Sequence, residues 1–177
     1  MSLKSRHTRH RASASQAPRQ LAGQVPPGGA KGKPPRFFLK AVELSVKAHG
    51  PQIRRNNGGP YIGHVFDVMN RVEGYNAKTV AVLHDVLEDT AVTVRQLRAI
   101  GVPAIVIEAV QALTKPPHAG VSDAAYLDYV RETIVPNKLA CQVKLADLAS
   151  NLRTADRPHR NKYLKAQAVI EKAMAGR

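Results

Sequence analysis

The chain has 177 residues, enough for one domain with its own core and too few for two large ones. It carries 27 Lys and Arg against 13 Asp and Glu, a formal charge of +14, and has no run of about 18 apolar residues that could span a membrane. The single cysteine, Cys141, cannot form an internal disulfide, and no secretory signal is recognisable. These features exclude an integral membrane protein and predict a protein of the reducing cytoplasm.

The first 36 residues differ in composition from the rest of the chain. They contain eight basic residues, no acidic residue, five prolines and four glycines, without apolar periodicity. We predict a flexible basic arm at residues 1–36 and a folded domain at residues 37–177. Clustered cations favour weak, nonspecific contact of the arm with nucleic acid, and the alternatives are a solvated tail or an organelle transit peptide.

Downstream of the arm, apolar residues recur at helical spacing, and no alternating strand pattern occurs. In chain order we predict helices at residues 37–49, 64–73, 76–88, 93–100, 103–113, 122–132, 137–153 and 160–175. Glycines at 50, 74 and 101 are expected to end helices, and Asn76 and Asn137 to cap them. The pattern predicts an all-α helical bundle.

Residues 81–90, Ala-Val-Leu-His-Asp-Val-Leu-Glu-Asp-Thr, carry the strongest chemical signal. On a regular helix, His84, Asp85, Glu88 and Asp89 would share one side, with apolar residues on the other. Three carboxylates on one face repel one another and, if half buried, require a compensating cation. The alternative is a solvated acidic face with a chance histidine, which the flanking apolar residues disfavour.

Two further segments supply metal-ligand chemistry. His64 is expected to begin a helix, and Asp147 lies on a later helix with Asn151 one turn beyond it. Taken singly, His64 is explained as a helix-start residue and Asp147 as a salt-bridge partner. Two imidazoles and two carboxylates together suit Mn, Fe, Mg or Zn and leave positions for water and a substrate oxygen. Their combination predicts a metal centre.

The order of these residues, His64, His84-Asp85, Glu88-Asp89 and Asp147, resembles the HD superfamily of metal-dependent phosphohydrolases. Within it, the chain is similar to the hydrolase domain of RelA/SpoT homologues and to stand-alone small alarmone hydrolases. The further motifs that carry the likeness are Ala48-His49, Gln52, Arg54-Arg55, Pro60-Tyr61-Ile62, Ala112-Leu-Thr-Lys115 and Lys144-Leu-Ala-Asp147 through Asn151-Leu-Arg-Thr154. They extend over residues 40–155, and the resemblance implies an HD-domain helical bundle.

The resemblance also implies residue roles. The metal, usually Mn²⁺ with other divalent ions compatible, would be bound by His64, His84, Asp85 and Asp147. Glu88 and Asp89 would activate or position the attacking water. The substrate would be bound by Arg54, Arg55, Lys115, Asn151 and Tyr163.

The implied activity is that of the stringent response: hydrolysis of the 3′-pyrophosphate of ppGpp or pppGpp to GDP or GTP and pyrophosphate. The chain departs from the family at Val65, where Pro is usual, at Arg55, where Lys is usual, and at Leu148 and Ser150, where long enzymes carry Arg and His. These departures spare the metal ligands and leave the nucleotide open. Alternatives are an HD-type enzyme acting on another nucleotide or on NADPH, and a basic nucleic-acid-binding protein with a vestigial HD site.

Overall fold

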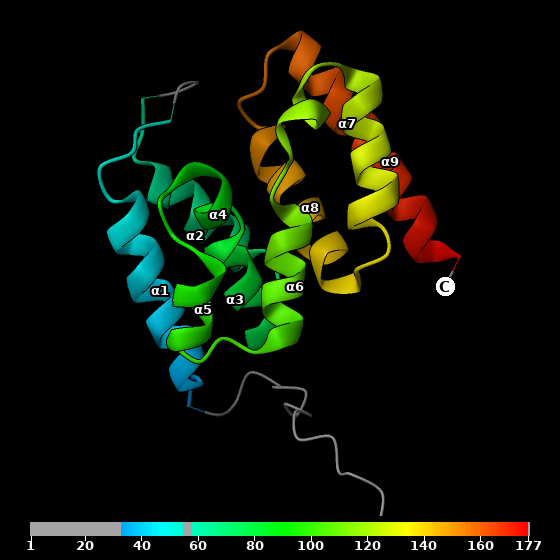
Figure 1. Ribbon diagram of the computed structural model, residues 1–177. Coiled ribbons are helices and arrows are strands. Elements are labelled where there is room, and N and C mark those ends of the chain that lie inside the picture. The colour runs from blue at the N-terminus through cyan, green and yellow to red at the C-terminus, as the bar shows by residue number, and fades with distance from the viewer. Residues whose placement is uncertain (1–32, 55–57, 177) are drawn as a thin grey trace, which may run out of the picture.

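The computed structural model describes residues 33–54 and 58–176, and within these ranges it contains helices and no strand (Figure 1). The elements are α1 (Arg36–His49), α2 (Tyr61–Asn70), α3 (Tyr75–Leu83), α4 (Val86–Asp89), α5 (Val94–Ala99), α6 (Ala104–Leu113), the 3-10 turn η1 (Pro117–Gly120), α7 (Asp123–Tyr129), the π-helical turn η2 (Val130–Ile134), α8 (Lys138–Asn151) and α9 (Arg157–Ala175). The predicted all-α bundle is confirmed. Most of the predicted arm lies outside the described residues, and its last residue, Arg36, belongs to α1.

Most helix boundaries follow local signals. Thr93 caps α5 in a reciprocal capping box, and Ser122 and Asn137 cap α7 and α8 through their side-chain oxygens. Four predicted N-termini, those of α1, α2, α3 and α9, lie one to three residues too late. Asn76 lies inside α3, α2 begins directly after Pro60, and α9 begins earlier than expected because Asp156 accepts a hydrogen bond from the His159 backbone N–H at 3.0 Å.

The predicted helix at residues 76–88 is interrupted between α3 and α4. Asp85, at φ −109° and ψ −2°, departs from ideal α-helical angles within the right-handed region, and the His84 Nδ1 atom lies 2.7 Å from the Ala81 carbonyl oxygen. The regular helix expected through His84, Asp85, Glu88 and Asp89 is therefore wrong, although all four residues line one cavity. A regular helix would separate the side chains of His84 and Asp85 by about 100°. The break instead lets these two neighbours contact each other and line the same cavity.

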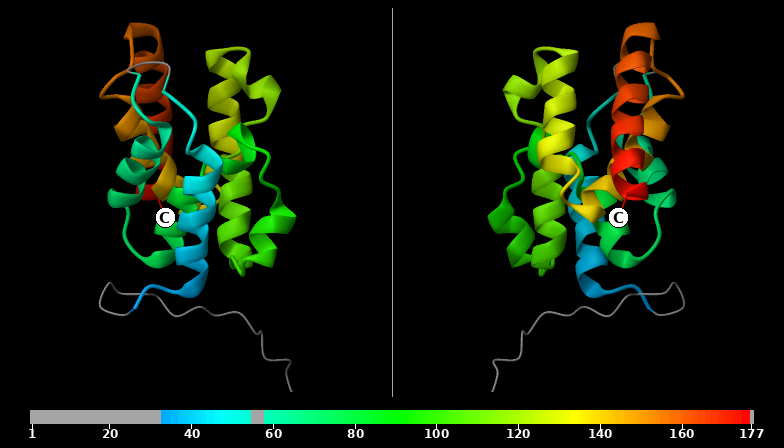
Figure 2. Two further views of the ribbon diagram at one scale, coloured as in Figure 1. Left: turned by 90° about the vertical axis from the view of Figure 1, so that its left-hand side faces the viewer. Right: turned by 90° about the vertical axis from the view of Figure 1, so that its right-hand side faces the viewer.

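The two helices α3 and α8 lie in the interior of the bundle. α3 packs against α1, α2, α6 and α8, while α8 also contacts α2, α6 and α9, and α9 in turn lies alongside α7 (Figures 1 and 2). Apolar side chains therefore surround α3, where residues 79–83 are all buried. Polar groups at the ends of such enclosed helices lie away from bulk water, which sets the electrostatics of the site.

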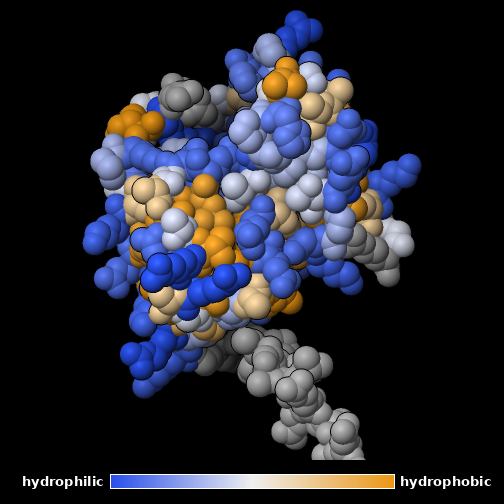
Figure 3. All heavy atoms as spheres, viewed as in Figure 1, coloured by the Kyte–Doolittle hydropathy of each residue, from blue (hydrophilic) through white to orange (hydrophobic). Residues whose placement is uncertain are grey.

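Hydrophilic side chains cover most of the face seen in Figure 3, around an apolar area over the region of α4 and α5. Within the described ranges, no helix combines the length and the apolar character that a bilayer crossing demands.

Candidate metal centre and active site

A cavity of about 610 Å³ opens where the end of α3 faces α8. Ten of the eleven site residues predicted from the sequence line this cavity: Arg54, His64, His84, Asp85, Glu88, Asp89, Lys115, Asp147, Asn151 and Tyr163. The eleventh, Arg55, lies outside the described residues. Residues spread over about a hundred positions of the chain are thus brought to one place.

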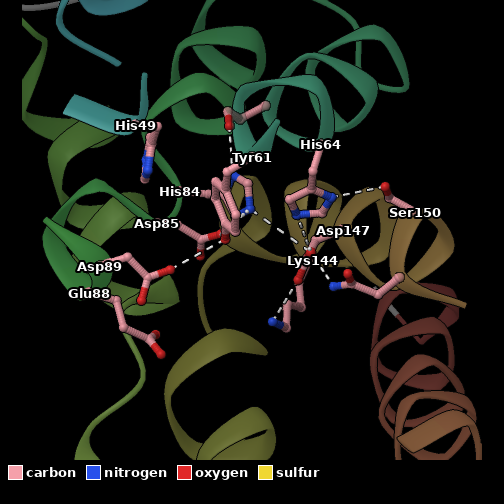
Figure 4. Close-up of polar contacts among 12 residues, drawn as sticks. His49, Tyr61, His64, His84, Asp85, Glu88, Asp89, Lys144, Asp147 and Ser150 are labelled. Atoms are coloured by element: carbon pink, nitrogen blue, oxygen red, sulfur yellow. Dashed lines mark hydrogen bonds and ion pairs between the residues drawn. The ribbon is translucent and has the colours of Figure 1, made fainter. Parts of the chain in front are cut away.

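Three buried side chains form the centre of the site. His64 from α2, His84 from the turn after α3 and Asp147 from α8 each offer one ligand atom, and these atoms lie within 4.8 Å of one another (Figure 4). The Asp147 Oδ1 atom is 3.3 Å from His64 Nε2 and 3.9 Å from His84 Nε2. A metal ion could be held by these three groups.

The surroundings of His84 test whether a cation fits. Its Nδ1 atom faces the Ala81 carbonyl, which only accepts, so Nδ1 carries a proton. Its Nε2 atom is buried without a hydrogen bond and faces Asp85 Oδ2 at 2.8 Å. A nitrogen lone pair beside carboxylates is stabilised by a proton or a cation between them. With Asp85 included, the donors are two imidazoles and two carboxylates, which suits Mn, Fe or Zn.

Charges around the cluster shift its pKa values strongly. Burial lowers the pKa of His84, but Asp85 and Asp147 outweigh this effect and raise it to about 9. Burial raises the pKa of Asp147, but Lys144, at 2.8 Å, and the two histidines bring it well below its usual range. The carboxylate therefore stays ionised at neutral pH, and a metal ion has to displace a proton from His84 in order to bind.

The two acidic residues of α4 differ in their surroundings. Glu88 accepts hydrogen bonds from the Lys115 backbone N–H at 2.8 Å and from Lys115 Nζ at 2.5 Å. Asp89 forms no ion pair with the described lysines and arginines, and lies 3.3 Å from the Tyr61 hydroxyl. Burial, and then Asp85 and Glu88, raise the pKa of Asp89. Asp89 is thus the better proton acceptor of the two.

The substrate-side residues extend the cluster along α8 and α9. Arg54 donates to Asn151 Oδ1 at 2.8 Å, and Asn151 Nδ2 donates to Asp147 Oδ1 at 2.7 Å. Tyr163 lies on α9, and burial raises its pKa. The neighbouring Lys162 places Nζ 5.6 Å from the Tyr163 ring centroid and also lines the cavity.

Four carboxylates and four Lys or Arg side chains line this one cavity, an arrangement suited to a metal ion together with a polyphosphate.

Sequence reasoning assigned no role to three residues that the structure places at the site. The Tyr61 hydroxyl donates a short hydrogen bond to Asp85, and its ring stacks on His49 with centroids 5.1 Å apart. Lys144 pairs with Asp147, and Ser150 Oγ lies 3.0 Å from His64 Nδ1. All three lie within the motifs quoted above, and for Lys144 the spacing of three residues before Asp147 was a usable signal.

Comparison with known proteins agrees with the motifs. No family model matches the chain. A probable guanosine-3′,5′-bis(diphosphate) 3′-pyrophosphohydrolase of Synechocystis sp. is 33% identical over 129 residues, which cover 68% of this chain and 16% of that relative. The chain therefore spans about a sixth of the relative's length.

A solved structure gives the same result for the fold. The structure, reported under the statement that a metazoan orthologue of SpoT hydrolyses ppGpp and plays a role in starvation responses, is 21% identical with a TM-score of 0.66. The match covers 82% of this chain and 89% of that one. The chain thus has the all-α HD-domain fold, similar to the RelA/SpoT hydrolase domain, that its motifs predict.

Proposed function

We propose that the chain is a metal-dependent phosphohydrolase that removes the 3′-pyrophosphate of ppGpp or pppGpp, yielding GDP or GTP and pyrophosphate, in the cytoplasm. The observation that carries this proposal is the convergence of two histidines, two aspartates, an acidic pair and four cationic side chains on one cavity. The names of the similar proteins, both of which refer to ppGpp, support the choice of nucleotide.

His64, His84, Asp85 and Asp147 would hold the metal, for which we propose Mn²⁺. A metal ion bound there lowers the pKa of a water molecule and polarises a phosphoryl oxygen. The chain's own contribution is to keep the ligands in place: Lys144 and Asn151 each donate to one oxygen of Asp147, and Tyr61 donates to Asp85. These hydrogen bonds fix the carboxylates before substrate arrives.

In the reaction, a water oxygen adds to the phosphorus bound to the 3′-oxygen, and the bond between that phosphorus and the 3′-oxygen breaks. Asp89 takes the proton of the water, because it has no cationic partner in the described part of the chain and its pKa is raised. The 3′-oxygen takes up a proton from solvent and leaves as a hydroxyl, and Asp89 returns the proton that it accepted to solvent. Glu88 acts indirectly, by holding Lys115 at the cavity wall.

The cationic side chains would bind the phosphates. Lys115 and Lys144 line the cavity beside the carboxylates, where they offset the negative charge that develops in the transition state. Arg54 and Asn151, which contact each other, would bind the nucleoside side of the substrate together with Tyr163, which also lines the cavity. We also propose substrate binding by Arg55, the next residue in the sequence, and weak nucleic-acid contact by the basic arm.

The test is a hydrolysis screen of the purified protein loaded with Mn²⁺. Substrates are ppGpp, pppGpp, NADPH, nucleoside triphosphates and dinucleotides, with products separated by ion-exchange chromatography. We expect GDP and pyrophosphate from ppGpp in equal amounts. If only NADPH or another nucleotide is hydrolysed, the proposed substrate is wrong and the proposed phosphohydrolase chemistry stands. If the protein binds metal but hydrolyses none of these substrates, the alternative of a nucleic-acid-binding protein is favoured.

A further inference from the structure

His64 is held from the side that faces away from the cavity. Its Nε2 atom faces Asp147, while its Nδ1 atom lies 3.0 Å from the Ser150 hydroxyl (Figure 4). His64 is 5% exposed and Ser150 is 3% exposed, so water does not compete for this hydrogen bond. The orientation of the imidazole ring therefore depends on Ser150.

Ser150 also hydrogen-bonds to the carboxylate of Asp67, which lies one turn after His64 on α2 and lines the same small cavity as Ser150. Burial raises the pKa of Asp67, but Ser150, Arg71 and Arg153 outweigh it and lower the pKa below its usual range. Arg71 lies 3.2 Å from Asp67 and Arg153 lies 3.4 Å from it. Asp67 is therefore ionised at neutral pH and can only accept hydrogen bonds.

The direction of these hydrogen bonds follows from counting protons. Because ionised Asp67 only accepts, the single proton of the Ser150 hydroxyl points to Asp67. The Ser150 oxygen is then left to accept, so His64 Nδ1 must be the nitrogen that carries a proton. With its proton on Nδ1, His64 would offer the Nε2 lone pair to a metal ion bound between Nε2 and Asp147, whose Oδ1 atom lies 3.3 Å away.

We propose that Ser150 and Asp67 are positioning residues of the metal centre, forming a relay in which Asp67 orients Ser150 and Ser150 fixes His64 with Nε2 free to bind the metal. Asp67, Ser150 and Arg153 line a second cavity of about 260 Å³. His64 lines both this cavity and the metal cavity, so it connects the relay to the metal centre. This inference rests on the proposed metal site and is independent of which nucleotide is hydrolysed.

The test measures Mn²⁺ affinity by calorimetry in nucleotide-free protein. Ser150→Ala should weaken binding by about 10- to 100-fold, the usual effect of losing a hydrogen bond to a metal-binding histidine. Asp67→Asn should weaken it in the same direction, and Ser150→Thr, which keeps the hydroxyl, should restore it. Asp128→Asn is the matched control, because Asp128 also pairs with an arginine but lies away from both cavities.

A double variant tests the order of the relay. If Asp67 acts through Ser150, Asp67→Asn should have no further effect on Mn²⁺ affinity in the Ser150→Ala background. Additive losses would overturn the relay, and so would wild-type affinity in Ser150→Ala. Thermal unfolding of each variant separates lost ligand orientation from lost stability.

A second measurement needs no variant. Nitrogen NMR of the metal-free wild-type protein reports which imidazole nitrogen carries the proton, and the relay requires Nδ1–H at His64. A proton on Nε2 alone would overturn it. Metal binding by the wild type without turnover of ppGpp would contradict only the proposed function, whereas absence of metal binding would contradict both.

Discussion

Glu88 and Lys115 form a two-point contact, in which the carboxylate accepts from both the backbone N–H and the side-chain ammonium of the lysine. This contact joins α4 to the segment that follows α6, across 27 positions of the chain. It also separates the roles of two neighbouring carboxylates, because Asp89 has no such partner in the part of the chain that the structure describes.

The first prediction compares these two carboxylates. Asp89→Asn keeps the shape but removes the proton acceptor, so turnover of ppGpp should fall by roughly 10²- to 10⁴-fold with bound Mn²⁺ unchanged. Glu88→Gln weakens the contact that holds Lys115 beside the charge of the transition state, so it should lower kcat by less than Asp89→Asn does. The double variant should lose at least as much turnover as Asp89→Asn. Steady-state rates and elemental analysis check this, and undiminished turnover in the double variant would show that the water is activated elsewhere.

The second prediction concerns Asp85 and metal-linked stability. Mn²⁺ binds the folded protein and should raise its Tm by mass action. Asp85→Ala should abolish most of that rise, and Asp85→Asn should lose metal and activity together. Asp128→Asn, a surface carboxylate paired with Arg131, should show the full rise. Differential scanning calorimetry with and without Mn²⁺ measures the effect, and an unshifted wild-type Tm would contradict the ligand assignment.

The third prediction concerns pH. The pKa of His84 is raised to about 9, so at neutral pH the imidazole holds a proton that a metal must displace. Because protons compete with the metal, Mn²⁺ affinity should rise as the pH increases and level off near the pKa of His84. Calorimetry at pH 7 in buffers of different ionisation enthalpy should detect the release of a proton. Binding without proton release would show that His84 is neutral before the metal arrives.

The fourth prediction concerns Lys162, which lines the cavity from α9 and forms no ion pair within the described ranges. Lys162→Met should raise KM for ppGpp roughly 10- to 100-fold, the effect of one lost charge-assisted hydrogen bond to phosphate, with a smaller change in kcat. Lys165→Met on the same helix removes an equal charge from an exposed position outside the cavity and serves as the control. Equal KM values for the two variants would exclude a phosphate contact by Lys162.

The fifth prediction concerns the basic arm. Deleting residues 1–32, which stops before α1, should leave the rate on ppGpp nearly unchanged and weaken RNA or DNA binding that is sensitive to salt. A filter-binding series at increasing salt and the hydrolysis assay measure the two effects. Loss of turnover would make the arm part of the active site.

The sequence determined the features that depend on neighbours along the chain. Helical periodicity and the caps at Thr93 and Asn137 follow from the side chains of a few consecutive residues. The ligand types and their order could also be predicted, since His84-Asp85 and Asp147 are recognisable in short motifs. The interruption of the helix at His84 and Asp85 could not be predicted, because residues 76–88 keep helical periodicity and contain no glycine or proline.

Only the tertiary structure decided how those residues act together. Arg54 meets Asn151 across 97 positions and His64 meets Ser150 across 86, and no local pattern encodes such pairs. In the sequence, Ser150 is recognisable only as a departure from the family. Its contact with His64, seen in the structure, is what suggests that it positions this histidine. The physical reason is that hydrogen-bond direction, burial and pKa depend on distances between helices, which the packing of α2, α3 and α8 sets.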